Sequence, residues 1–387
     1  MSANLTPQQL DLQRGIRELC GKFPDQYWND LEKDSRYPEE FVSALSGDGW
    51  LGLLIPEEFG GGSLGVLEAS IVLEEINASG GNGACAHAQM YTMGTILRHG
   101  SAEQKARYLP DIAAGALRLQ AFGVTEPASG SDTGKITTTA RRSGDTFKIN
   151  GQKIWTSRAN HSDLMLLLAR TSPFGESGRR TDGLSVFIVD MREALGHGLT
   201  IRPIDTMISH DTNEIFFDGV EVPAGNLIGE EGQGFRYILS GMNVERILVA
   251  SEAVGDGRWF VQRASEYGSS RRVFDRPVAQ NQGVQFPIAR AYANVMAARL
   301  MTRVAAERFD AGQSCGTEAN MAKLLASEAS WEAANAALDT HGGFGFAREF
   351  SIERKFRETR LFKIAPVSNN LVLSYLAQHV LGMPRSY

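Results

Sequence analysis

Two short motifs in the middle of the chain combine aromatic rings with small hydrogen-bonding residues. The first is Phe122-Gly-Val-Thr-Glu-Pro-Ala-Ser-Gly-Ser-Asp132, and the second is Asn150-Gly-Gln-Lys-Ile-Trp155-Thr-Ser157. We expect the first to be extended and then to turn, whereas the Asn-Gly pair of the second predicts a tight hairpin turn before a strand. Together they would form a pocket with walls of Phe122 and Trp155 and a hydroxyl rim of Thr125, Ser131 and Ser157. Such a pocket suits a flat heteroaromatic ring with a phosphate-bearing tail, although each motif alone also suits an ordinary strand of a barrel.

The composition limits the classes of protein to which the chain can belong. It has 387 residues, of which 42% are hydrophobic and 22% charged, so two or three globular domains are expected. A net charge of -6 argues against nucleic acid as a partner, and no apolar run approaches the roughly 20 residues that span a bilayer. No export signal stands at the N-terminus, and the three cysteines, Cys20, Cys85 and Cys315, have no paired spacing. A cytoplasmic protein without membrane insertion is therefore expected.

The first 118 residues have a helical pattern. Thr6 followed by Pro7 predicts a capped helix start, and Ser101-Ala-Glu-Gln104 predicts a capping box at another. A further helix is expected from Pro38 to Gly47.

The pattern changes near residue 119 and again near residue 233. Short β-rich runs alternate with turn residues such as Gly144-Asp145 and Asn150-Gly151, which predicts an antiparallel β-sandwich or barrel over 119–232. Long helices follow at about 235–273, 281–312, 317–340 and 369–381 and predict a four-helix bundle over 233–387. The expected fold is thus α+β and multidomain, with an N-terminal α-helical domain over 1–118.

Two other site patterns are rejected. Gly47-Asp-Gly-Trp-Leu-Gly52 matches G-x-G-x-x-G, but it follows a helical pattern, whereas a dinucleotide fingerprint follows a strand. The seven histidines have no metal-ligand spacing, so no metal site is predicted.

The two central motifs, in this order and between two helical regions, resemble the flavin-binding strands of the acyl-CoA dehydrogenase family, and the resemblance covers nearly the whole chain. It implies FAD as cofactor and the three-domain plan that the periodicity predicts independently. The positions that match the family's flavin site are Phe122, Val124, Thr125, Gly130, Ser131, Trp155 and Ser157. Ser368 and Asn370 match two further cofactor contacts near the C-terminus.

A second group of matching residues would reach the FAD of a neighbouring subunit. It comprises Arg271, Phe274, Gln282, Gly342 and Gly343. An arginine beside a pyrophosphate is chemically reasonable because its guanidinium can donate two hydrogen bonds to phosphate oxygens. Taken alone, Arg271 and Arg272 are more typical of a solvated helix end. The resemblance implies a homotetramer, or at least a dimer.

The catalytic base is where this chain departs from most of the family. Most members carry a glutamate in a Tyr-Glu-Gly-Thr-like segment, but here the matching stretch is Ile364-Ala-Pro-Val-Ser368, with Pro366 at the base's position. A minority, including isovaleryl-CoA and long-chain acyl-CoA dehydrogenases, carry the base on the first long C-terminal helix, where this chain has Glu245. Helical geometry places Glu245 on an apolar stripe with Ile238, Met242, Val249 and Ala253. The alternative is a structural ion pair between Glu245 and an arginine such as Arg246.

Pro366 raises a second question. In the family, the backbone N–H at this position helps to bind the thioester oxygen, and proline has none. Another donor could serve, the alignment could slip by one residue, or the chemistry could differ.

The expected substrate contacts follow from the same resemblance. They are Ser131, Arg246, Met90, Tyr91 and Ala365. Met90 and Tyr91 lie in the helix that matches the acyl-chain wall, although a methionine-rich helix is also ordinary core. Asn82 stands where glutaryl-CoA dehydrogenase has an arginine, which disfavours a dicarboxylyl substrate. The base position and the small Ala365 favour a branched or medium-to-long acyl chain.

The leading expectation is an acyl-CoA dehydrogenase of fatty-acid β-oxidation that passes electrons to electron-transferring flavoprotein. A flavoprotein oxidase or monooxygenase of the same fold, acting on a non-thioester, is the alternative that Pro366 raises. A flavin- or CoA-binding module without catalysis is the third.

Overall fold

The computed structural model describes residues 5–173, 179–209 and 211–385. They form two compact units, each built from segments that are far apart in the sequence. We call them the helical unit, which comprises Met1–Asp34, Gly65–Ala84 and Asn243–Tyr387, and the mixed unit, which comprises Ser35–Leu64 and Cys85–Met242. The predicted division after residues 118 and 232 follows the order of the sequence instead and stays a prediction.

The described part of the chain before the sheet contains six α-helices: α1 (Pro7–Cys20), α2 (Asp25–Lys33), α3 (Glu39–Gly47), α4 (Val66–Ala78), α5 (Ala84–His99) and α6 (Ala102–Ala113). Two of the predicted starts are confirmed. The Thr6 hydroxyl accepts from the amide of Gln9, and the Ser101 hydroxyl accepts from the amide of Gln104, each within a complete capping box. The short helix α2 was not anticipated.

The strands of the mixed unit form one sheet, which is eight-stranded over the described residues and has the order β6-β7-β3-β2-β4-β5-β8, with β1 beside β4. The pairing is antiparallel except for β1 and β2, which pair parallel to β4. The strands are β1 (Ala121–Gly123), β2 (Thr139–Ser143), β3 (Thr146–Ser157), β4 (Leu164–Arg170), β5 (Leu184–Asp190), β6 (Leu199–Pro203), β7 (Thr212–Pro223) and β8 (Leu227–Ile228). The short helix α7 (Met191–Ala194) follows β5.

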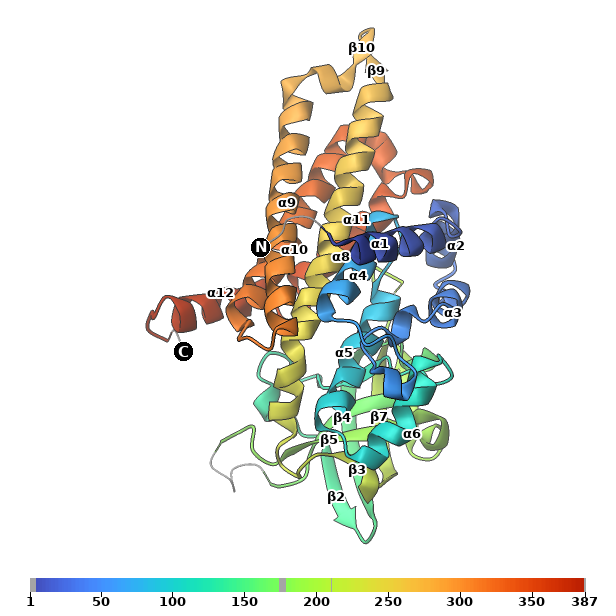
Figure 1. Cartoon of the computed structure of the whole chain (residues 1–387), viewed down its shortest axis with the longest axis vertical. Helices are drawn as coiled ribbons and strands as arrows, with labels where there is room; N and C mark the ends of the chain where they lie inside the picture. The colour runs from blue at the N-terminus through green and yellow to red at the C-terminus, as the bar shows by residue number, and fades with distance from the viewer. Residues whose placement is uncertain (1–4, 174–178, 210, 386–387) are drawn as a thin grey trace. The chain divides into compact units, whose positions relative to one another are not determined.

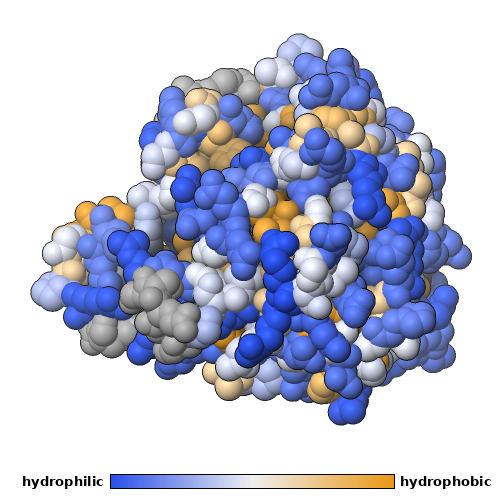
Figure 2. All heavy atoms as spheres, turned by 90° about the horizontal axis from the view of Figure 1, so that it is seen from below, coloured by the Kyte–Doolittle hydropathy of each residue, from blue (hydrophilic) through white to orange (hydrophobic). Residues whose placement is uncertain are grey.

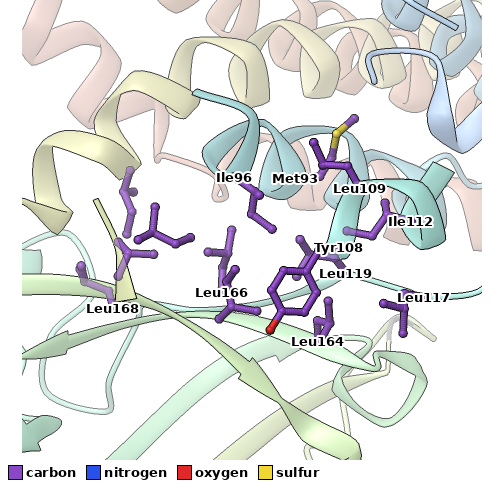
Figure 3. Close-up of a cluster of buried hydrophobic side chains, with 14 of the residues drawn as sticks. Met93, Ile96, Tyr108, Leu109, Ile112, Leu117, Leu119, Leu164, Leu166 and Leu168 are labelled. Carbon is purple, nitrogen blue, oxygen red and sulfur yellow. The ribbon is translucent and has the colours of Figure 1, made fainter. Parts of the chain in front are cut away.

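A hydrophobic cluster joins this sheet to two of the helices. Side chains from α5, α6 and β4 meet there, including Met93, Ile96, Leu109 and Leu166 (Figure 3). A second cluster contains Phe147, Phe187 and other buried residues of the same sheet. Every residue of β4 is buried. A continuous apolar run such as Leu164–Ala169 is what a strand covered on both faces requires.

The predicted hairpin turn at Asn150-Gly151 is wrong. β3 runs through both residues, and its register against β7 shifts between Ile149 and Asn150, which marks a β-bulge. Gly151 has φ 146°, and a Cβ there would lie 2.5 Å from the Thr138 hydroxyl oxygen. The Asn150 side chain accepts from the amide of Gly219 on the β7 strand. An Asn-Gly pair supplies the same backbone freedom to a bulge as to a turn, and pairing with the long β7 strand decides between them.

The C-terminal helices belong mainly to the helical unit and lie close to the predicted ranges. They are α8 (Gly234–Ser270), α9 (Gln282–Asp310), α10 (Gly316–His341), α11 (Ile352–Arg360) and α12 (Asn369–Tyr375), with the small strands β9 (Arg272–Val273) and β10 (Arg276–Pro277) between α8 and α9. α10 packs against α9 and α11 (Figure 1). Its buried surface is rich in alanine, which lets neighbouring helices approach closely: Ala319, Ala322, Ala326, Ala329, Ala333, Ala334, Ala336 and Ala337. Helix α11 was not predicted.

The described surface carries hydrophilic residues over most of the face shown in Figure 2, with small hydrophobic patches between them. No helix among the described residues is both long enough and apolar enough to cross a membrane.

Candidate active site

A buried ion pair joins the two central motifs in the mixed unit. The Lys153 ammonium of β3 donates to a carboxylate oxygen of Glu126 at 2.9 Å and to the Val124 carbonyl oxygen at 3.0 Å. Lys153 is fully buried and Glu126 is 5% exposed. The ammonium therefore holds the segment after β1 against the strand that carries Trp155.

Glu126 also receives hydrogen bonds from the next turn of the chain. Its carboxylate accepts from the amide and the hydroxyl of Thr137, at 2.7 and 2.8 Å, and from the amide of Thr138 at 2.9 Å. Burial opposes ionisation, but the Lys153 charge and these donors outweigh it and hold the pKa of Glu126 at about 2. The carboxylate is therefore ionised at neutral pH and ties three chain segments together.

Trp155 lies on an irregular stretch of β3. The register against β7 shifts between Lys153 and Thr156, and Trp155 has φ 62°, a conformation that a bulky residue rarely adopts. Its side chain is 57% exposed, although Lys153, two residues before it, and Thr156, directly after it, are buried. The amide of Ile154 meanwhile donates to the Thr125 carbonyl oxygen at 2.9 Å, so the two motifs stay paired here. A bulge redirects a side chain in this way, and strained backbone at such a point often accompanies a functional role.

The remaining residues of the predicted flavin site lie on this same unit. Phe122 and Val124 are half-buried and pack against the α5–α6 cluster, while Gly130 and Ser131 lie in an exposed turn that the Ser129 hydroxyl closes onto the Asp132 carbonyl oxygen. Among the described residues, the predicted rim hydroxyls have no hydrogen-bond partner and are accessible to a ligand: Thr125, Ser131 and Ser157.

Two predicted substrate contacts on α5 differ in exposure. The Tyr91 ring is half-buried and meets the Phe122 ring edge-on, with centroids 5.7 Å apart. Met90 is only 1% exposed and serves as core packing in this structure. Tyr91 is therefore the better supported of the two, and both roles stay predictions.

Glu245 lies on α8 with its side chain 6% exposed. The residues predicted to share its face are buried or half-buried, as an apolar stripe requires: Ile238, Met242, Val249 and Ala253. Next to it, Arg246 donates to the side-chain oxygen of Asn243 at 3.0 Å. Burial lowers the pKa of Arg246, and the charges of Glu245 and Tyr375 act in the opposite direction.

The Ile364–Ser368 segment, which is predicted to match the family's base region, is held by a lysine that the sequence did not reveal. The ammonium of Lys323, on α10, donates to the Val367 carbonyl oxygen at 2.6 Å and to the Asn369 side-chain oxygen at 2.8 Å. Asn369 in turn donates to the Ser327 hydroxyl at 3.0 Å. Burial, followed by the neighbouring charges of Arg246 and Lys363, lowers the pKa of Lys323 to about 8. In the sequence, only the position of Lys323 on an alanine-rich helix face could have indicated that it is buried and holds this segment.

Other predicted residues of this segment have simpler environments. The Ser368 hydroxyl caps α12 by accepting from the Leu371 amide at 3.4 Å. Ala365 and Pro366 are half-buried, and Asn370 is exposed.

The residues predicted to serve a neighbouring subunit gather at one end of the helical unit. The Arg271 guanidinium lies over the Phe344 ring, 5.6 Å from its centroid, and so lies near the turn that contains Gly342 and Gly343. Phe274, in the β9–β10 hairpin, is 91% exposed with φ 52°. Gln282 begins α9 and is exposed, as are both glycines. These groups are available to a molecule outside the unit.

Comparisons with known proteins match acyl-CoA dehydrogenases along nearly the whole chain. Residues 6–116, 121–220 and 232–381 match the N-terminal, middle and C-terminal domain models of acyl-CoA dehydrogenase. The chain is 35% identical over 381 residues to acyl-CoA dehydrogenase FadE12 of Mycobacterium tuberculosis, covering 97% of this chain and 96% of the relative. It is 32% identical to an acyl-CoA dehydrogenase of Bacillus subtilis, with 98% and 99% covered. A solved structure of glutaryl-CoA dehydrogenase with glutaryl-CoA is 30% identical, with a TM-score of 0.93 and 100% and 98% covered.

The chain belongs to the acyl-CoA dehydrogenase family. It is an oxidoreductase of that family, with the predicted helical, β and helical regions. Acyl-CoA dehydrogenases use FAD and act on acyl-CoA thioesters. The residues present fit FAD, because the mixed unit offers unpartnered rim hydroxyls and an exposed indole on a strained strand.

The Glu126 carboxylate should make this acyl-CoA dehydrogenase sensitive to acid. Its pKa is about 2 in the folded protein against a usual 4.5, so its contribution to the free energy of unfolding is complete above about pH 5 and is lost as the pH falls towards 2. Between pH 5 and pH 3 the loss from this group is about 2 kcal/mol. Urea unfolding at both pH values measures it. Glu126→Gln should remove this part of the acid dependence, whereas Glu221→Gln, at an exposed carboxylate of β7, should retain it. An equal acid dependence in wild type and Glu126→Gln would contradict the prediction.

Replacing Lys323 should impair catalysis more than folding. Lys323→Met removes the donors that hold Val367 and Asn369 but also removes a buried charge, so the free energy of unfolding should change little. Misplacement of the segment should lower kcat for acyl-CoA oxidation about 10- to 100-fold while bound flavin is retained. Lys22→Met, which makes the same change at an exposed lysine of the helical unit, is the control. A kcat within twofold of wild type would show that the segment keeps its place without Lys323.

Proposed function

We propose that this protein catalyses the FAD-dependent α,β-dehydrogenation of an acyl-CoA thioester to the trans-2-enoyl-CoA, with Glu245 as the base. The single observation that carries the base assignment is a carboxylate buried on the apolar face of α8, in a chain whose Ile364–Ser368 segment contains no acidic residue.

The role of Glu245 follows from the chemistry of the reaction. Its carboxylate takes the proton from the α-carbon of the thioester, and the electrons of that C–H bond form the new double bond as the β-hydrogen leaves with its electron pair. FAD, when bound, accepts that hydride. A buried carboxylate within reach of the α-proton is suited to such a transfer.

We propose that the mixed unit holds the isoalloxazine ring. Trp155 and Phe122 would supply aromatic walls, and the hydroxyls of Thr125 and Ser157 would bond the edge of the ring. The exposed turn at Gly130 and Ser131 would contact the FAD phosphates and the substrate, because its backbone and hydroxyl donors are accessible. The remaining predicted contacts are Val124, Ser368 and Asn370.

The favoured substrate is a branched or medium-to-long acyl chain. Ala365 is small and half-buried, which leaves space in the Ile364–Ser368 segment. Tyr91 and Met90 would line the acyl chain, and Arg246 would lie near the coenzyme A part. The favoured setting is fatty-acid β-oxidation in the cytoplasm, with electron-transferring flavoprotein as acceptor.

Glu245→Gln should abolish reduction of the flavin by acyl-CoA without loss of FAD. Removal of a general base lowers rates by about 10²- to 10⁴-fold. The measurement is anaerobic bleaching of the flavin absorbance with straight, branched and aromatic acyl-CoAs. Glu266→Gln, at an exposed position near the other end of α8, provides the matched control. Bleaching of Glu245→Gln at the wild-type rate would rule out this base.

A second candidate is a flavoprotein oxidase or monooxygenase acting on a non-thioester, and Pro366 is the observation that favours it. The proline cannot supply the backbone donor for a thioester oxygen, and loss of one such donor lowers rates by about 10²- to 10³-fold. Rapid peroxide formation in air, together with no bleaching by any acyl-CoA of the panel, would favour this candidate over the dehydrogenase.

We propose a homotetramer in which Arg271, Phe274, Gln282, Gly342 and Gly343 contact the FAD of a neighbouring subunit. Large apolar side chains that stand exposed on the helical unit support this assembly: Phe274, Phe346 and Leu381. Sedimentation equilibrium should give four times the chain mass, and Phe274→Ala with Arg271→Gln should lower the FAD content. A monomer that retains one FAD per chain would contradict the assembly.

A further inference from the structure

Three buried carboxylates lie along one side of α8. Glu245, Glu252 and Asp256 are spaced by seven and four residues, which places their side chains on the same face of a helix. Their exposed fractions are 6%, 0% and 0%. Glu245 is the proposed base, whereas the other two lie further along the helix and take no part in the proton transfer. We call these three residues the carboxylate stripe.

A loop rich in glycine lies between α4 and α5. It comprises Gly80–Gly83, and we call it the glycine loop. Two cations of α11, which lies beside α8 in the helical unit, donate to its main chain (Figure 1). The Arg354 guanidinium donates to the Gly80 carbonyl oxygen at 2.8 Å. The Lys355 ammonium donates to the Gly81 carbonyl oxygen at 2.8 Å. The loop has no repeating ladder to satisfy these carbonyl groups, so the two cations fix its position.

The glycine loop packs directly against the carboxylate stripe. A Cβ at Gly83 would lie 3.0 Å from a carboxylate oxygen of Glu252 and 2.6 Å from the side-chain oxygen of Asn77. That amide oxygen accepts from the Gly83 backbone N–H at 2.8 Å, and the Asn77 side-chain nitrogen donates to Asp256 at 2.8 Å. Glycine is required here because the backbone approaches both side chains closely.

Asp256 and Lys355 lie at the centre of a buried ion cluster. The Lys355 Nζ atom is 2.5 Å from Oδ1 of Asp256 and 3.2 Å from Oε2 of Glu358. Glu358 also pairs with Arg354 at 2.9 Å. All four side chains are buried, and they comprise two cations and two carboxylates, so their charges balance. Loss of one partner from such a cluster is unfavourable, and the complete cluster therefore holds α8, α11 and the glycine loop in one arrangement.

The glycine loop lies at a defined distance from the proposed base. Glu252, which lies against Gly83, follows Glu245 by seven residues, or about 10 Å along the helix axis. An extended chain of atoms advances about 1.2 Å per bond, so an acyl chain that runs from Glu245 along the carboxylate stripe reaches the glycine loop after roughly eight carbons.

We propose that Asp256 and Lys355 are positioning residues for the acyl chain, which hold the glycine loop where the end of a medium-length chain meets it. This inference rests on the proposed function, because a base at Glu245 makes the carboxylate stripe the side along which the chain extends. Neither residue touches the substrate, and both act through the main chain of the loop. An acyl chain too short to reach the loop does not depend on them.

Asp256 can take up a proton within this cluster. The charged side chains that face it are Lys355 and Glu358 of α11, with Arg354 beyond Glu358, and Glu252 lies one turn before it on α8. Among the described residues, its Oδ2 atom is buried without a hydrogen-bond partner, which leaves a place for the proton. Burial, opposed by the Lys355 charge and assisted by that of Glu358, raises the pKa of Asp256 to about 6.

Proton uptake by Asp256 should loosen the glycine loop without unfolding the protein. It leaves Lys355 and Arg354 with one carboxylate between them, so the Lys355 ammonium loses its closest partner. The pKa of Asp256 is higher in the folded than in the unfolded chain, so protonation of this group as the pH falls through 6 favours the folded state. A change in the loop at this pH is therefore not explained by unfolding that Asp256 causes.

The test compares octanoyl-CoA, whose chain would reach the glycine loop, with butanoyl-CoA, whose chain would not. The ratio of kcat/KM for the two substrates is measured with the holoenzyme at about pH 7.5 and about pH 5, on either side of the Asp256 pKa. Titration of the base and of the coenzyme A part affects both substrates and cancels in the ratio. In the wild type the ratio should fall about tenfold at the lower pH, which corresponds to lost contact with roughly two methylene groups.

Two variants separate the ion pair from other effects of pH. Asp256→Asn and Lys355→Met should each show the low ratio at both pH values. Asp30→Asn is the matched control, because it makes the same change at an exposed position of the helical unit, and it should keep the pH dependence of the wild type. Amide hydrogen exchange of the glycine loop, read by mass spectrometry at about pH 7.5, should be about tenfold faster in Asp256→Asn than in wild type or Asp30→Asn.

A wild-type ratio that is the same at both pH values, or an equal loss for both substrates, would overturn the inference. A ratio that still depends on pH in Asp256→Asn would also overturn it, as would glycine-loop exchange at the wild-type rate in both Asp256→Asn and Lys355→Met. Faster loop exchange in an enzyme whose flavin no acyl-CoA bleaches would show that the pair holds the loop while refuting the proposed dehydrogenation.

Discussion

The pairing of Lys153 with Glu126 is the constraint on which the geometry of the two central motifs depends. A buried ammonium is unfavourable unless its donors are used, and Lys153 uses them on the Glu126 carboxylate and the Val124 carbonyl oxygen. Glu126 is likewise satisfied by the Thr137 and Thr138 donors. Because removal of either partner would leave an uncompensated charge, the pair specifies one arrangement of the loop after β1 relative to β3. Trp155 can adopt an unfavourable backbone conformation two residues later because its surroundings are held on both sides.

Buried lysines that donate to main-chain carbonyl oxygens also occur in the helical unit. Lys323 reaches the Val367 carbonyl oxygen at 2.6 Å, and Lys355 reaches the Gly81 carbonyl oxygen at 2.8 Å while pairing with Asp256 at 2.5 Å. Like Lys153, both lysines are fully buried on a regular element, and each donates to the main chain of a segment outside the helices and strands. Such segments cannot satisfy their carbonyl groups through a repeating ladder, and a long, flexible cation supplies the missing donors. Rigid helices and strands thereby fix loops that would otherwise be mobile.

These contacts between residues distant in the sequence also explain which features the sequence could predict. Local signals were sufficient where the partner is close in sequence, as in the capping boxes at Thr6 and Ser101, and where the periodicity is clear, as on the face of α8 that buries Glu245. The helix α11 was missed because two of its buried residues, Arg354 and Lys355, have the composition of a solvated face. Their burial depends on Asp256 and the loop at Gly80, which are distant in the sequence. The prediction of a hairpin turn at Asn150-Gly151 was wrong for a related reason, since only the pairing with β7 distinguishes a bulge from a hairpin. The roles assigned to the flavin and substrate residues stay predictions.

The proposed position of the base on α8 has a consequence for the segment that contains Pro366. A carboxylate on a helix is positioned by the regular backbone hydrogen bonds of that helix, whereas a base in a loop depends on whatever holds the loop. With Glu245 on α8, the Ile364–Ser368 segment no longer needs to place an acidic group within a fraction of an ångström, and a proline without an N–H becomes tolerable there. Lys323 still fixes the segment through Val367 and Asn369, so its remaining task is to shape the space beside the substrate. Side-chain substitutions that leave the segment in place should therefore alter which acyl chains are accepted before they alter the rate of proton removal.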